Sequence, residues 1–183
     1  MLKKLIFAAL VGLTACSSPK SFFTADTRNK VQEKGIPLEK LQFYIDKDVE
    51  LRRELVSRDA KVRSGKVKIE NGKYINIILL EKGTQGVCTG ENQNTLDIAF
   101  ESGEGKNLVF DLPGGRSFTN NVYSLEAEKW LKPFNGPEIG KITYDGDVYF
   151  MRFTGPRPKL LVKKTSKDKY EVNKRVMSGR KIQ

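Results

Sequence analysis

The sequence predicts a mainly β protein, an antiparallel sandwich or barrel of about nine or ten short strands with one short N-terminal helix. Two dipeptides carry most of this prediction, because Asn71-Gly72 and Asp145-Gly146 each separate two strand-like runs. Asn, Asp and Gly tolerate the positive φ of a type I′ turn, so both dipeptides indicate β-hairpins. Most other segments are short runs of β-forming residues between turn residues, and a single stretch carries helix signals.

The helix is expected over residues 24–34. Thr24 or Asp26 can cap its N-terminus, and Gly35 with Pro37 ends it. The strands are expected, in chain order, at residues 41–45, 49–55, 66–70, 73–80, 95–100, 107–112, 122–131, 141–144, 147–153, 159–164 and 170–176. The last two of these strands form a basic C-terminal hairpin.

Two segments are harder to interpret. Apolar side chains recur with period two in residues 122–131, but Leu, Glu, Ala and Lys in the same run also favour a helix, and we predict a strand. Residues 83–90 are rich in glycine, but Gly83, Gly86 and Gly90 do not have the spacing of a dinucleotide-binding loop. We therefore predict that all three are loop glycines.

The N-terminus has the layout of a secretory signal peptide. Lys3 and Lys4 precede an apolar run over residues 5–13, and small residues precede Cys16. At about 1.5 Å per residue, this apolar run is too short for a helix that crosses a hydrocarbon core of about 30 Å. We therefore predict a signal peptide over residues 1–15 and no spanning helix.

The run Leu13-Thr14-Ala15-Cys16 resembles the lipobox of bacterial lipoproteins. The resemblance implies that the Cys16 thiol carries a diacylglycerol group, that cleavage occurs just before Cys16, and that its new amine is acylated. Several acyl chains give stable attachment where a single chain is marginal. Ser17 stands where inner-membrane lipoproteins often carry Asp, which implies delivery to the outer membrane, and the lack of a nearby acidic cluster favours its periplasmic side. The alternative is a secreted protein that is cut elsewhere.

Length and composition fit one domain behind this leader. Removal of 15 residues leaves 168, enough for a single core, and the mean hydropathy of −0.47 is that of a folded body without further membrane-spanning stretches. We expect a lipidated tether over residues 16–23 and a single β-rich domain over residues 24–183. If Cys16 is lipidated, Cys88 cannot form an intramolecular disulfide, and we expect it to be buried.

The net charge of +11 is concentrated at the C-terminal end. Residues 157–183 contain ten Lys or Arg and two acidic residues, whereas residues 16–156 contain 21 and 20. This asymmetry indicates an anionic partner, or else a solvated strand pair with lysines on its outer face, and both interpretations stay open. The candidate contact residues are Lys163, Lys164, Lys167, Lys169, Lys174 and Arg175.

Several kinds of chemistry are excluded or unsupported. The chain has no histidine, so it lacks every catalytic site built on imidazole and the commonest transition-metal ligand. Gly105-Lys106-Asn107 fails the P-loop pattern, which needs Ser or Thr after the lysine. The acidic runs at 46–48 and 145–147 lack the remaining ligands of an EF-hand. We predict no catalytic residue, metal site or cofactor.

The first functional hypothesis is a non-enzymatic lipoprotein that acts as a binding or assembly module in the cell envelope. Its partners would be the membrane, through the lipid anchor, and an anionic glycan, lipid or acidic envelope protein. Nucleic acid is not expected, because the basic end has a single aromatic residue for stacking on bases, Tyr170. In general style, residues 141–153 and 174–181 resemble small lipoproteins of Bacteroidetes-type bacteria, which implies no particular activity.

Two alternatives remain. An enzyme acting on envelope glycans would need two carboxylates about 5 to 9 Å apart, one of them with a raised pKa. A carrier of a small apolar ligand would need an apolar cavity of roughly 300 Å³ or more.

Overall fold

The described part of the chain folds into two antiparallel sheets that pack into a sandwich with one α-helix at its end. The computed structural model describes residues 19–56, 65–112 and 121–163. Its elements are β1 (Lys20–Phe22), α1 (Ala25–Glu33), a 3₁₀ turn η1 (Leu38–Lys40), β2 (Phe43–Ile45), β3 (Val49–Leu55), β4 (Lys66–Glu70), β5 (Lys73–Leu80), β6 (Gln85–Glu91), β7 (Thr95–Ala99), β8 (Asn107–Asp111), β9 (Ser124–Leu125), β10 (Lys129–Leu131), β11 (Glu138–Tyr144), β12 (Asp147–Phe153) and β13 (Leu160–Lys163). The predicted class, mainly β with one short N-terminal helix, is confirmed.

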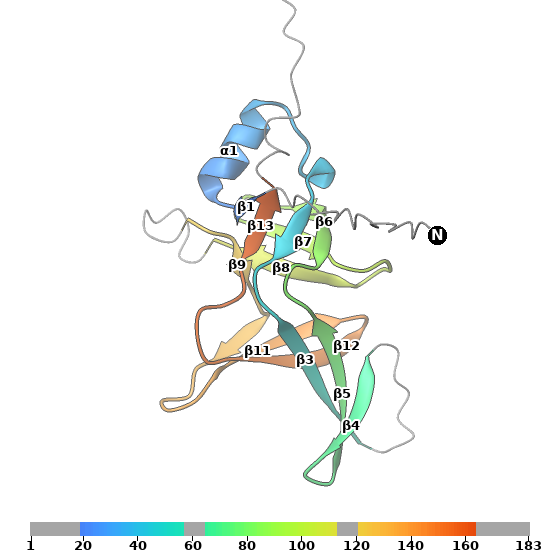
Figure 1. The fold of residues 1–183 in the computed structure, drawn as a ribbon. Coiled ribbons are helices and arrows are strands. Elements are labelled where there is room, and N and C mark those ends of the chain that lie inside the picture. The colour runs from blue at the N-terminus through green and yellow to red at the C-terminus, as the bar shows by residue number, and fades with distance from the viewer. Residues whose placement is uncertain (1–18, 57–64, 113–120, 164–183) are drawn as a thin grey trace, which may run out of the picture.

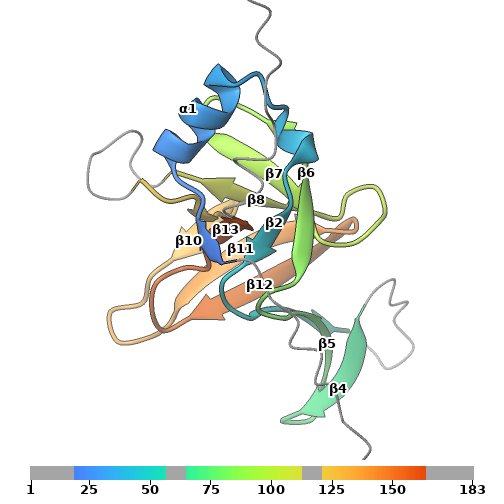
Figure 2. The same cartoon turned by 45° about the horizontal axis from the view of Figure 1, so that its top comes forward.

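The seven-stranded sheet has the order β1-β13-β2-β6-β7-β8-β9, and the six-stranded sheet has the order β10-β11-β12-β3-β5-β4. Figure 1 shows α1 at the end of the seven-stranded sheet, with the six-stranded sheet on the other side of the body. The hairpin of β4 and β5 projects from the body in both views (Figures 1 and 2).

The core lies between the two sheets and is built from alternating strand residues. Phe43 of β2 and Ile98 of β7 come from the seven-stranded sheet, and Leu51 of β3 and Tyr149 of β12 come from the six-stranded sheet. All four are at most 2% exposed. The chain reaches the second sheet directly after β2, since β2 and β3 are neighbours in sequence but belong to different sheets.

The local sequence signals predict the helix and both tight hairpins correctly. Thr24 is the N-cap of α1, and its Oγ1 accepts a hydrogen bond from the backbone N–H of Thr27. Asn71 and Asp145 adopt φ of 49° and 52°, and each is followed by a glycine with positive φ, as a type I′ turn requires.

The structure corrects the tether and one strand. Residues 20–23 do not belong to a tether, because Lys20–Phe22 forms β1 and Phe23 is fully buried. Residues 122–131 do not form one strand but two, β9 and β10, which belong to different sheets. The segment around β9 binds two distant parts of the chain, since Tyr123 donates its N–H to Phe23 O and accepts at its own carbonyl from Leu160 N.

The glycine-rich stretch and the C-terminal hairpin are also corrected. Gly86 and Gly90 lie in β6 and not in a loop. A Cβ on Gly86 would lie 2.7 Å from Ile98 Cγ2, so the absent side chain lets β6 approach its neighbours. β13 pairs with β1 along one edge and with β2 along the other, so it cannot be the first strand of the predicted hairpin. Residues 164–183 lie outside the described residues.

Candidate functional site

A cluster of lysines and apolar side chains covers the outer face of β1, β13 and β2. Lys20 lies opposite Lys163, Phe22 lies opposite Leu161, and Leu161 lies opposite Tyr44. Because side chains alternate between the faces of a strand, these residues share the outer face, while Leu160 and Val162 enter the core. We call this surface the basic face; its exposed or half-buried members are Lys20, Phe22, Lys159, Leu161 and Lys163, and the ring of Tyr44, which is 2% exposed, lies beneath Lys20 and Lys163.

The basic face opposes two like charges directly. Lys20 and Lys163 are cross-strand partners, an arrangement that destabilises a sheet. Their ammonium groups lie 3.8 Å and 5.7 Å from the centre of the Tyr44 ring, which compensates part of this cost through cation–π attraction. The Lys159 ammonium lies 5.4 Å from the ring centre of Phe22, which is 46% exposed.

No carboxylate in the described part of the chain lies within ion-pair distance of these three ammonium groups. Lys73 and Lys106 differ from them, since Lys73 pairs with Glu54 and Lys106 pairs with Glu101. Among the residues that the structure describes, positive charge thus gathers on the basic face without a carboxylate partner, and an anion from outside the chain could supply one.

The basic face is also close in sequence to the predicted lipidation site. Lys20 is four residues after Cys16. Four residues span at most about 14 Å, so Lys20 cannot be farther than that from the Cα of Cys16. At the other end of the face, Lys163 is followed by residues 164–183, which contain seven Lys or Arg and two acidic residues.

Of the predicted contact residues, Lys163 is in the basic face. The other five, Lys164, Lys167, Lys169, Lys174 and Arg175, lie outside the described residues. Sequence reasoning missed Lys20 and assigned no contact role to Lys159, because the pairing of β1 with β13 joins segments about 140 residues apart. The sequence signal for this strand is the alternation of Lys20 with Phe22, which is too short to distinguish a strand from a tether.

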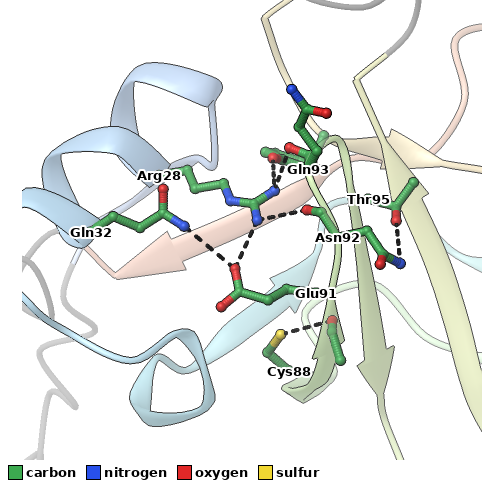
Figure 3. A network of polar contacts seen from close by, with 9 residues as sticks. Arg28, Gln32, Cys88, Glu91, Asn92, Gln93 and Thr95 are labelled. Carbon is green, nitrogen blue, oxygen red and sulfur yellow. Dashed lines mark hydrogen bonds and ion pairs between the residues drawn. The ribbon is translucent and has the colours of Figure 1, made fainter.

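A second polar cluster holds α1 on the body. The Arg28 guanidinium donates to Tyr123 Oη at 2.7 Å, to the carbonyls of Asn92 at 2.7 Å and Gln93 at 3.1 Å, and to Glu91 at 2.7 Å (Figure 3). Burial alone would lower the pKa of Arg28, but its bonds with Tyr123 and Glu91 raise it overall. With its donors directed at protein acceptors, this cluster fastens the helix and offers little to a ligand.

A third cluster joins the two sheets and contains adjacent carboxylates. Burial, followed by the charge of Glu126, raises the pKa of Asp111 to about 6. One oxygen of Glu126 accepts from Trp130 Nε1 at 2.5 Å and the other from Arg157 at 2.9 Å. Arg157 also binds Glu138 and stacks on the Trp130 ring at 3.8 Å. Since both oxygens of Glu126 are engaged, we interpret this cluster as a clamp between the sheets.

The other candidate sites, a buried thiol and a small pocket, provide few reactive or ligand-binding groups. Cys88 is 3% exposed, as expected, and burial raises the pKa of its thiol to about 11, so the thiolate is scarce at neutral pH. A pocket walled by Leu108, Val109, Ala127 and Ile142 has a volume of about 210 Å³, below the usual size of a ligand cavity. Within residues 19–56, 65–112 and 121–163 there is no cluster of three metal-ligating side chains.

Comparison with known families, with curated proteins and with solved structures finds no match for this chain. The helical segments that the structure describes are all too short or too polar to cross a bilayer. The functional argument therefore depends on the residues themselves, and the basic face is a cluster of described cationic side chains for which no ion pair with a described carboxylate is found.

Proposed function

We propose that this protein is a non-enzymatic binding or assembly module of the cell envelope, anchored through Cys16 to the outer membrane on its periplasmic side, with the basic face held against anionic lipid head groups. The observation that carries the proposal is the direct opposition of Lys20 and Lys163, without a described acidic partner, at the point where the chain leaves the anchor.

A lipid anchor at Cys16 would bring the lysines of the basic face close to the membrane surface. An acylated Cys16 would keep Lys20 at most about 14 Å from the head groups, so that its ammonium can approach them to within the screening length of about 8 Å in physiological salt. Each lysine near an anionic surface contributes about 1 kcal/mol. Three lysines would therefore contribute about 3 kcal/mol, or roughly a hundredfold in affinity, and residues 164–183 would add further positive charge.

Vesicle flotation tests the basic face without help from the anchor. A secreted form with Cys16→Ser is mixed with vesicles of phosphatidylcholine alone or with about 30% phosphatidylglycerol. We expect binding to the anionic vesicles only, weakened by added salt because the interaction is electrostatic. The triple variant Lys20→Gln, Lys159→Gln, Lys163→Gln should bind at least tenfold more weakly.

The matched control carries Lys66→Gln, Lys68→Gln and Lys141→Gln, which remove the same charge from the six-stranded sheet. Equal losses in both triple variants would refute a role specific to the basic face. Retention by an anionic polysaccharide or an acidic envelope protein, without vesicle binding, would replace the membrane by that partner.

Metabolic labelling tests the anchor. Cells that express the full chain and are fed an alkyne analogue of palmitate should yield a labelled protein, and Cys16→Ala should lose both the label and the outer-membrane fraction. An unlabelled wild-type protein, with Cys16→Ala still in that fraction, would refute the anchoring.

A further inference from the structure

A polar pocket opens beside the basic face and shares Lys159 with it. Its volume is about 480 Å³, within the usual range of 300 to 1,000 Å³ for small-molecule sites. The wall comes from three parts of the chain: Ser124 in β9, Lys132 and Glu138 at the two ends of the β10–β11 connection, and residues 155–159 between β12 and β13.

The pocket carries a surplus of positive charge. Lys132, Arg157 and Lys159 line it, against Glu138 as the one carboxylate in the described lining. Both oxygens of Glu138 accept from Arg157, at 3.2 Å and 2.9 Å, and this hydrogen bonding lowers the pKa of Glu138. The carboxylate is thus ionised and already paired. Glu126, outside the lining, also binds Arg157, so Lys132, Arg157 and Lys159 exceed these two carboxylates by one positive charge.

Arg157 keeps hydrogen-bond donors free while its orientation is fixed. A guanidinium has five N–H groups, and three of them are used: Nε and Nη2 donate to Glu138, and Nη1 donates to Glu126. One N–H on each terminal nitrogen remains. The ring of Trp130, 3.8 Å from the guanidinium carbon, holds the group in place, so a ligand would lose little entropy in ordering it.

From this arrangement we infer that the pocket binds a phosphate ester, with Lys132 and Lys159 as the charged contacts and the free N–H groups of Arg157 as directed donors. A phosphate accepts several hydrogen bonds from a guanidinium and two ammonium groups, and its charge matches the surplus. The inference rests on the proposed function, because the head groups near the basic face carry such phosphates. A soluble phosphate ester has the same chemistry.

Calorimetric titration of the full chain in non-ionic detergent tests the inference. The probes are inorganic phosphate, sn-glycerol 3-phosphate and short-chain phosphatidylglycerol. We expect saturable binding of at least one phosphate ester, and Lys132→Gln should weaken it at least fivefold. Lys141→Gln, which removes one charge from the exposed side of β11, should leave it unchanged.

A second variant obstructs the pocket without a change of charge. A Cβ on Gly155 meets no atom within 4 Å, and its φ is not positive, so Gly155→Leu can place a side chain at this lining position. We expect it to reduce binding at least tenfold. The fluorescence of Trp130, the single tryptophan, checks that each variant keeps the clamp intact.

The outcomes separate the pocket from the basic face. Binding of phosphatidylglycerol but not of glycerol phosphate would identify a lipid head group, and equal affinities would identify a soluble ester; both support the pocket. Absence of saturable binding by all three probes, or binding that Lys132→Gln and Gly155→Leu leave unchanged, would overturn it. If vesicle flotation still depends on Lys20 and Lys163 after such a result, the proposed role of the basic face stands and only the pocket proposal is rejected.

Discussion

Replacement of Arg28 by alanine should be among the most damaging single changes in this fold. The Arg28 side chain is 8% exposed and joins α1 to the β6–β7 connection and to Tyr123 through four hydrogen bonds. Arg28→Ala removes all four, and the carbonyls of Asn92 and Gln93 lose this donor. No apolar packing takes its place.

The magnitude follows from burial and partners. Removing one member of a buried, hydrogen-bonded charge pair costs about 3 to 5 kcal/mol. Glu91 is 36% exposed and regains water, which places Arg28→Ala near the lower limit, at about 3 kcal/mol. In a domain of this size the melting temperature would fall by roughly 6 to 12 °C. Urea unfolding, followed by circular dichroism, measures the free energy directly.

A matched control lies one helical turn away. Gln32 contacts the same Glu91 oxygen at 3.5 Å on the exposed side of α1, so Gln32→Ala should cost less than about 0.5 kcal/mol. If Arg28→Ala stayed within 1 kcal/mol of wild type, or matched Gln32→Ala, the view that Arg28 fastens the helix would be wrong.

Three further predictions concern the interior. Asp111→Asn should stabilise the protein at pH 8 by about 1 to 2 kcal/mol, because the pKa of Asp111 in the folded protein, about 6, exceeds the unfolded value near 3.9. This advantage should shrink as the pH falls through 6 and vanish below about 4. Urea unfolding of both proteins at pH 8 and below pH 4 measures the difference. Cys88 should react with a water-soluble thiol reagent at pH 8 at least a hundredfold more slowly than a free thiol, since burial raises its pKa to about 11; reaction at the rate of the free thiol would contradict its burial. Gly86→Ala should cost about 1 to 3 kcal/mol in urea unfolding, because its Cβ would overlap Ile98 and Phe100; an unchanged midpoint would contradict the close approach of β6.

Short-range chemistry made part of this fold predictable. Asn71-Gly72 and Asp145-Gly146 specify their turns by backbone preference alone, so β4–β5 and β11–β12 could be placed with β4, β5 and β12 correct at both ends. Thr24 specifies the start of α1 in the same way. Each signal is contained within a few residues and needs no knowledge of the rest of the chain.

Long-range pairing explains the errors. The sequence predicts a loop where β6 lies, because Gly86 and Gly90 weaken strand propensity, whereas the crowding that makes glycine suitable there comes from Ile98 and Phe100 on other parts of the chain. β1 is three residues long and is stabilised mainly by β13, far away in sequence. A propensity argument cannot detect such partners.

Short-range sequence signals could not identify the basic face either. The charge asymmetry of the sequence directed us to Lys163 and the residues after it, but the opposition of Lys20 and Lys163 depends on the register of β1 on β13. Composition left open an anionic partner or a solvated strand pair. Only the pairing of strands indicates which lysines share one surface near the predicted anchor.

Photo-crosslinking in membranes would test the orientation of the protein most directly. A benzophenone amino acid is placed at Phe22, in the basic face, or at Phe150, which is 42% exposed on the outer face of the six-stranded sheet. With the lipidated protein in its native membrane, we predict phospholipid adducts from position 22 and few or none from position 150. Adducts from position 150 alone, or equally from both positions, would contradict the proposal that the basic face lies against the membrane.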